Sequence, residues 1–156
     1  MVKEETVAHL NELIEVCMDG ERGYRTAADH VRNSQLESVF DEYAKQRARC
    51  ARQLQAEVER LGGDAADSGT LKAAVHRGWI DLKSALTGGD GSAIIAACET
   101  GEDFAQAAFE RVVNAGISGE TRSLVEKEWR QIGEAHQRLL RLKAEIAAGA
   151  EFQKNE

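Results

Sequence analysis

The sequence contains no proline and few aromatic residues, with two Trp, two Tyr and four Phe among 156 residues. Proline interrupts helices, whereas aromatic and β-branched residues favour strands, so this composition favours helix over sheet. No stretch alternates apolar and polar residues with a period of two, as a half-buried strand would. Together with abundant Ala, Glu, Leu and Arg, these absences predict an all-α protein.

The sequence also lacks features of membrane and secreted proteins. No segment approaches the run of about 18 apolar residues that a membrane span needs, and the first residues form no apolar signal core. The three cysteines are odd in number and show no Cys-x-x-Cys spacing, which indicates reduced thiols. The net charge of -7, with both signs interspersed, disfavours nucleic acid or an anionic membrane as a partner. We expect a cytoplasmic protein with one domain, residues 1–149, and a frayed charged tail, 150–156.

Apolar residues recur every three or four positions in four long segments, which is typical of amphipathic helices. The predicted helices cover about residues 5–31, 34–61, 92–115 and 120–148. Ser34 and Glu37 form a capping-box pattern at the start of the second. The long connection from the second helix to the third is expected to carry a short helix, 70–86, on which Trp79 anchors the crossover and His76 is partly exposed. The expected fold is a four-helix bundle with a long crossover.

One residue of the first helix interrupts an otherwise apolar stripe. The stripe consists of Val7, Leu10, Ile14, Cys17, Glu21, Tyr24, Ala28 and Val31. A stripe with this spacing is normally buried, so Glu21 is expected to point into the core. An unpaired buried charge costs several kcal/mol by a rough estimate, so a positive, protonated or metallic partner is expected there. Gly20 and Gly23 beside it indicate close approach of another backbone, room for a bound group, or simple tolerance.

The second helix offers one partner for this carboxylate. Its stripe contains Arg47, and counting outward from the short turn near residue 33 places Glu21 beside Gln46 or Arg47. The same count places Cys17 level with Cys50. These two cysteines, with Cys98 near the same layer, are either ordinary small core residues or a thiol site.

The third and fourth helices add further polar residues to apolar stripes. Glu102 lies in the third stripe, Glu99 precedes it by three residues, and His136 lies in the fourth stripe. Counting outward from the turn near residue 117 sets Glu99 opposite His136 and Glu102 opposite Gly133. Carboxylates and an imidazole that converge at mid-helix suit iron, manganese or zinc. The alternative is a layer without metal, in which the histidine hydrogen-bonds a neighbour and Glu21 pairs with Arg47.

Four stretches of the chain resemble a bacterial family of ferritin-like four-helix-bundle proteins whose function is unassigned. They are residues 19–24 (DGERGY), 61–64 (LGGD), 76–88 (HRGWIDLKSALTG) and 98–103 (CETGED). This resemblance implies a ferritin-like four-helix bundle with a long crossover between the second and third long helices, in agreement with the helix periodicity.

The wider ferritin-like group binds metal with a glutamate from each of two helices and a Glu-x-x-His pair from each of the other two. The residues that match are Glu21 on the first helix, Glu99 or Glu102 on the third and His136 on the fourth. The second helix offers Gln46 and Arg49 where a ligand pair is expected, and Gly133 stands three residues before the histidine. The complete di-iron set is therefore absent, and a di-iron oxidase ranks last among the hypotheses.

The leading hypothesis is a non-enzymatic, metal-binding or stress-associated ferritin-like protein. Its reduced site would bind iron or another divalent metal through Glu21, Glu99, Glu102 and His136. The alternative is a structural or interaction module whose inner polar residues form a buried ion-pair and hydrogen-bond layer without metal. We expect a homo-oligomer, most simply a homodimer, because twofold assemblies are the commonest.

Overall fold

The computed structural model describes residues 1–67, 78–88 and 90–154. Its elements are α1 (Lys3–His30), α2 (Ser34–Arg60), α4 (Leu82–Ala85), η2 (Leu86–Gly88), α5 (Gly91–Asn114) and α6 (Gly119–Lys154). These described parts contain no strand, so the all-α prediction is confirmed. Each predicted long helix begins within two residues of the observed start, and three of the four end within one residue of the observed end.

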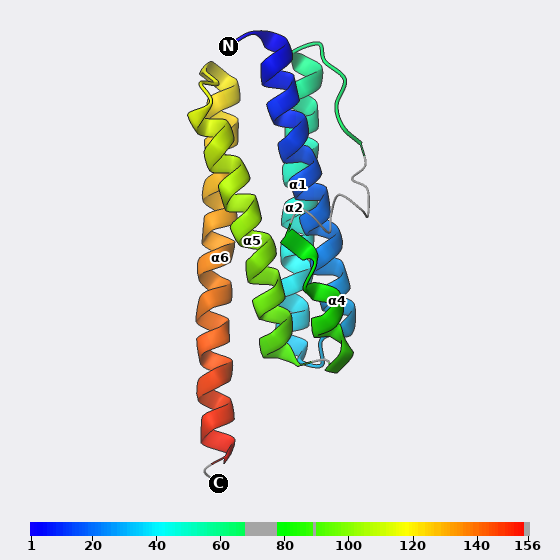
Figure 1. Ribbon diagram of the computed structural model, residues 1–156, viewed down its shortest axis with the longest axis vertical. Helices are drawn as coiled ribbons and strands as arrows, with labels where there is room; N and C mark the ends of the chain where they lie inside the picture. Colours follow the sequence, from blue (N-terminus) through cyan, green and yellow to red (C-terminus); the bar gives the residue numbers. More distant parts are fainter. Residues whose placement is uncertain (68–77, 89, 155–156) are drawn as a thin grey trace.

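The long helices form two antiparallel hairpins, α1–α2 and α5–α6, with α5 packed beside α1 (Figure 1). The first turn ends where Asn33 caps α2 by accepting a hydrogen bond from the Leu36 N–H at 3.0 Å, so the cap is one residue earlier than the predicted Ser34. Gly116 in the second turn has φ 101° and Gly119, the first residue of α6, has φ 63°, a conformation that glycine adopts without strain. No helix in the described parts is long and apolar enough to cross a bilayer.

The structure describes only the last part of the predicted crossover helix. The first part of the predicted helix 70–86, residues 70–77 with His76, lies outside the described residues. Within the described part, α4 covers only Leu82–Ala85. Gly78, at φ 102°, places the chain in a conformation that an α-helix does not contain. The segment nevertheless returns to the bundle, because Trp79 packs against the buried cluster that includes Tyr24.

The last helix is longer than predicted. The stripe predicts an end near residue 148, whereas α6 continues to Lys154 and projects beyond the other helices (Figure 1). The added segment contains alanine and glutamate and no proline, and the single Gly149 opposes helix formation by only about 1 kcal/mol. Residues 150–154, expected to be a frayed tail, therefore belong to the helix.

Among the described residues, the apolar core forms two clusters, one above the other along the bundle axis. One cluster contains buried residues 10–17 of α1, 50–58 of α2, 105–113 of α5 and 125–132 of α6. The other contains residues 24–31, 36–44, 94–98 and 135–142. The gap between the clusters falls at the same height on α1, α2 and α5. Arg47 and Glu102 occupy this gap, and both side chains are buried.

Candidate functional site

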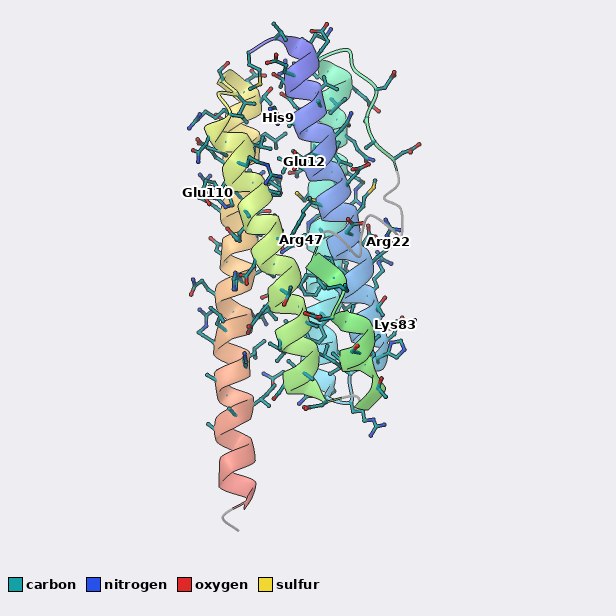
Figure 2. All side chains as sticks on the ribbon, in the orientation of Figure 1. His9, Glu12, Arg22, Arg47, Lys83 and Glu110 are labelled. Carbon is teal, nitrogen blue, oxygen red and sulfur yellow. The ribbon has the colours of Figure 1, made fainter. Side chains whose placement is uncertain are left out.

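The centre of the bundle contains a buried ion pair between α2 and α5. The side chains of Arg47 and Glu102 are 1% and 0% exposed, and the Arg47 guanidinium donates to Oε1 of Glu102. The Tyr24 hydroxyl, from α1, donates to the same oxygen. Figure 2 shows Arg47 at mid-height, between α5 and the α1–α2 hairpin. One carboxylate oxygen thus joins three helices, and we call Tyr24, Arg47 and Glu102 the central triad.

The charges of the central triad balance. Burial, the largest single influence, lowers the pKa of Arg47, but the Glu102 charge together with Tyr24, Cys17 and Cys50 outweighs burial and raises it. Burial, followed by the Glu102 charge, raises the pKa of Tyr24 well above its usual value, so the phenol stays neutral. The guanidinium carbon also lies 5.5 Å from the Tyr24 ring centroid, a cation–π distance. The triad therefore combines one cation, one anion and one neutral hydroxyl.

Two glycines of the DGERGY stretch make room for side chains from other elements. A Cβ atom on Gly20 would lie 3.2 Å from Nη1 of Arg47, so the missing side chain leaves space for the guanidinium. A Cβ atom on Gly23 would lie 2.4 Å from Cε3 of Trp79. These glycines therefore permit close approach by side chains. The sequence alone did not distinguish this from approach by a backbone, from room for a bound group or from simple tolerance.

Trp79 is inserted between α1 and α5. A Cβ atom on Gly101 would lie 2.4 Å from its Cε2, so the indole is flanked by Gly23 on one helix and Gly101 on the other. Its ring centroid lies 5.3 Å from that of Tyr24, in an edge-to-face arrangement. The prediction that Trp79 anchors the crossover is confirmed, and the anchor rests directly against the central triad.

Glu21 does not point into the core, so that prediction is wrong. Its side chain is 27% exposed and pairs with Arg25 across one turn of α1, with 2.7 Å between Oε1 and Nη2. The neighbouring Gly20 is the residue that faces Arg47. The three-four spacing from Cys17 fits Gly20 as well as Glu21, and Gly20 is the one that is buried. Gly20, Gly23 and Tyr24 form the buried face at this height, so Glu21 lies beside that face.

The other three predicted ligands each contact a different partner and do not meet one another. Glu102 belongs to the central triad. Glu99 lies 3.4 Å from Nζ of Lys143, and the Nε2 of His136 lies 3.6 Å from Asp103. His136 lines a hollow on the surface of the α5–α6 hairpin, with its side chain 20% exposed. Of the four residues, only Glu102 lies at the centre of the bundle.

The contacts between α5 and α6 explain why the predicted opposition of Glu99 and His136 is wrong. Near the turn, Trp129 donates to Gln106 at 2.7 Å, as counting from residue 117 predicts. Farther away, His136 meets Asp103, about one helical turn from Glu99. Helical side chains lean toward their own N-terminus, so those on α6 lean toward the turn and those on α5 lean away from it. Residues at unequal distances from the turn therefore meet.

No three His, Cys, Asp or Glu residues within 1–67, 78–88 and 90–154 are grouped closely enough to hold a metal ion. The four predicted ligands, as they are placed, do not form a metal-binding set. Arg47 also places a positive charge beside Glu102, the one predicted ligand that lies at the centre of the bundle. The bound metal is thus not supported by these positions and stays a prediction.

Glu128 on α6 is a buried acid that the predicted stripe of this helix did not include. The residue is 2% exposed and lies among the buried residues Val125, Ile132, Ala135 and Leu139. Burial raises the pKa of Glu128, while hydrogen bonding with the Cys50 thiol opposes the rise. The predicted stripe of this helix continued from Val125 to the apolar Trp129, but a three-residue step from Val125 leads equally well to Glu128, which is the buried one.

Glu57 is another buried acid, and it lies near one end of the bundle. The Glu57 carboxylate accepts two hydrogen bonds from Arg60, both at 2.7 Å, and one from the Thr121 hydroxyl at 2.5 Å. The hydrogen bonds from Arg60 lower the pKa of Glu57, burial opposes this, and Thr121 adds to the lowering. These contacts connect α2 to the first turn of α6, so the role of Glu57 is structural.

A comparison with family models finds a match over residues 5–115 to a family described as a domain of unknown function (DUF2383). The matched region contains α1, α2, the crossover and α5, and therefore all three members of the central triad. No curated protein matches the chain.

Proposed function

Since the chain belongs to the DUF2383 family, whose function is unknown, we propose that it is a non-enzymatic structural or interaction module. In this proposal the fold is a ferritin-like four-helix bundle, and its polar centre is an ion-pair and hydrogen-bond layer rather than a metal site. The single observation that carries the proposal is the central triad, in which the Glu102 carboxylate already has a buried guanidinium and a hydroxyl as partners.

Charge balance supports the absence of a metal from this centre. A divalent cation about 4 Å from the Arg47 guanidinium would be repelled by roughly 8 kcal/mol at an effective dielectric constant of 20. The single Glu102 carboxylate could offset that repulsion but would leave no net attraction. Further acids would be needed, and Glu21 and Glu99 already pair with Arg25 and Lys143. The central triad is therefore better suited to exclude a cation than to bind one.

The function of such a layer is to select one arrangement of helices. A buried polar group is satisfied only when its partner is opposite, so a shift of α5 along α1 and α2 would separate Glu102 from Arg47 and Tyr24. Purely apolar layers penalise such a shift less. We propose that this fixed arrangement presents a constant outer surface to a partner, with a second copy of the chain as the simplest partner.

The metal hypothesis stays as a second candidate because two of the predicted ligands each have one carboxylate oxygen that is buried without a hydrogen-bond partner in the described structure. They are Oε1 of Glu99 and Oε2 of Glu102. An unsatisfied buried oxygen is costly, and a metal is one group that could satisfy it. The metal content of the purified protein separates the two candidates.

The test is elemental analysis of untagged protein after incubation with iron or manganese, followed by removal of free metal. The module hypothesis predicts far less than one metal per chain for the parent and for Glu102→Gln alike. One metal per chain in the parent, lost in Glu102→Gln and retained in the surface control Glu134→Gln, would establish the metal hypothesis instead. Light scattering over a range of protein concentrations tests the proposed homodimer separately.

A further inference from the structure

Two of the three cysteines face each other across the α1–α2 hairpin. The Sγ atoms of Cys17 and Cys50 are 2.8 Å apart, and the two residues are 0% and 1% exposed. A disulfide has an S–S distance of about 2.05 Å, so a movement of about 0.8 Å would bring the sulfurs to bonding distance. Cys98 is also buried, but it belongs to the other apolar cluster.

The surroundings of this pair contain the groups that thiol oxidation requires. Cys50 hydrogen-bonds with Glu128, a buried carboxylate that can take a proton from the thiol. Arg47 stands one helical turn before Cys50 on α2, and its positive charge interacts with both cysteines and favours a thiolate. A carboxylate and a cation therefore lie beside the same thiol pair.

We propose that Cys17 and Cys50 are a redox modification site, at which a peroxide oxidises the two thiols to a reversible disulfide that cross-links α1 to α2.

The proposed oxidation proceeds in two balanced steps. Glu128 takes the proton of Cys50, whose thiolate attacks one peroxide oxygen; the O–O bond breaks, a sulfenic acid forms and the leaving hydroxide becomes water. Cys17 then attacks the sulfenic sulfur, the S–S bond forms and a second water leaves. The two thiols together lose two electrons and two protons, and hydrogen peroxide becomes two waters. A dithiol reductant reverses the change by thiol–disulfide exchange.

The depth of the pair sets the rate of this reaction. The contact with Cys17, and then burial, raise the pKa of Cys50 well above its usual value, so little thiolate is present at neutral pH. A peroxide must also enter a closed core. We therefore expect slow oxidation, with a product that is protected from bulky reductants until α1 and α2 separate.

The experiment uses the full-length folded protein treated with hydrogen peroxide, then unfolded and labelled with a maleimide. Intact mass is expected to show one labelled cysteine in place of three, with two hydrogen atoms lost, and peptide mapping is expected to find the Cys17–Cys50 cross-link and labelled Cys98. Dithiothreitol should restore three labelled cysteines. The oxidised protein should melt about 10 °C higher than the reduced form, because the cross-link closes a loop of 33 residues in the unfolded chain.

Three variants identify which residues take part in the oxidation. Cys98→Ser should oxidise like the parent, Cys50→Ser should leave Cys17 free, and Glu128→Gln should slow oxidation several-fold without preventing it. Three free thiols in the folded protein, under peroxide treatment that fully oxidises the urea-unfolded chain, would overturn the proposal. A disulfide between two chains, one that includes Cys98, or separate overoxidation of each thiol would overturn it equally.

Discussion

The insertion of Trp79 between α1 and α5 makes Gly101→Ala a sharp test of the packing. The added Cβ would lie 2.4 Å from Cε2 and 2.6 Å from Cζ2 of the indole, and Gly23 on the far side leaves the ring nowhere to move. Expelling a tryptophan from a packed site costs at least about 3 kcal/mol, and the half-buried Trp79 belongs at this lower limit. The higher helix propensity of alanine stabilises the variant by about 1 kcal/mol relative to glycine. The variant should therefore lose about 2 kcal/mol.

Thermal and urea unfolding followed by circular dichroism would measure this loss, with an expected Tm decrease of about 4–8 °C for a chain of this size. Gly133→Ala is the matched control, because the nearest atom outside its own helix would lie at 3.5 Å, an ordinary contact. The control should be neutral or gain up to about 1 kcal/mol from helix propensity.

A double-mutant cycle separates the clash with the indole from a clash between helix backbones. When Trp79→Ala has already taken the indole away, Gly101→Ala no longer creates a clash and should change sign, stabilising the protein by about 1 kcal/mol. Equal destabilisation in the presence and absence of the indole would refute the account of Trp79 and would place the cost in the α1–α5 backbone contact instead.

Three further predictions concern buried and exposed ionisable groups. Because burial raises the pKa of Glu128, its ionised form destabilises the folded state above that raised pKa, and this cost disappears below the unfolded pKa of about 4.3. Glu128→Gln should therefore raise Tm at pH 8 and leave it unchanged at pH 4. The control Glu134→Gln should leave Tm unchanged at both pH values. Glu21→Ala should lower the free energy of unfolding in urea by only about 0.3–0.5 kcal/mol, the value of a surface ion pair at i and i+4. A loss of several kcal/mol would show that the Glu21 side chain is buried in the core. With Glu128 as the internal base, peroxide oxidation of Cys50, followed by mass spectrometry, should vary little from pH 7 to 9. In Glu128→Gln it should accelerate about tenfold per pH unit, because the thiolate then forms only by loss of a proton to solvent; a tenfold rise per pH unit in the parent would contradict the role of Glu128.

Much of the fold follows directly from apolar spacing. The predicted stripes of α2 and α5 are almost entirely buried, including their polar members Arg47 and Glu102. The short turn between α1 and α2 allowed simple counting to place Cys17 level with Cys50, and the sulfurs do meet. Local rules succeed here because neighbouring helices joined by a tight turn have little freedom to shift.

The partner of Arg47 could not be predicted in the same way. Counting from a turn relates only helices that the turn joins, so it offered Glu21 on α1 as the partner. The true partner, Glu102, comes from α5, whose height relative to α2 is set by a long crossover and by Trp79 packed between glycines. Small differences in helix phase then decided which polar residues face inward, and they favoured Gly20 and Glu128 over Glu21 and His136.

The central claim is that Glu102 is neutralised by Arg47, and a double-mutant cycle of Arg47→Met and Glu102→Leu tests it most directly. Urea unfolding would be measured in a Tyr24→Phe background, so that no hydroxyl is left without its acceptor. Each single change should cost about 3–5 kcal/mol because it leaves a buried charge unpaired, whereas the double change should cost about 1 kcal/mol or less. Additive losses in the double variant would contradict the account.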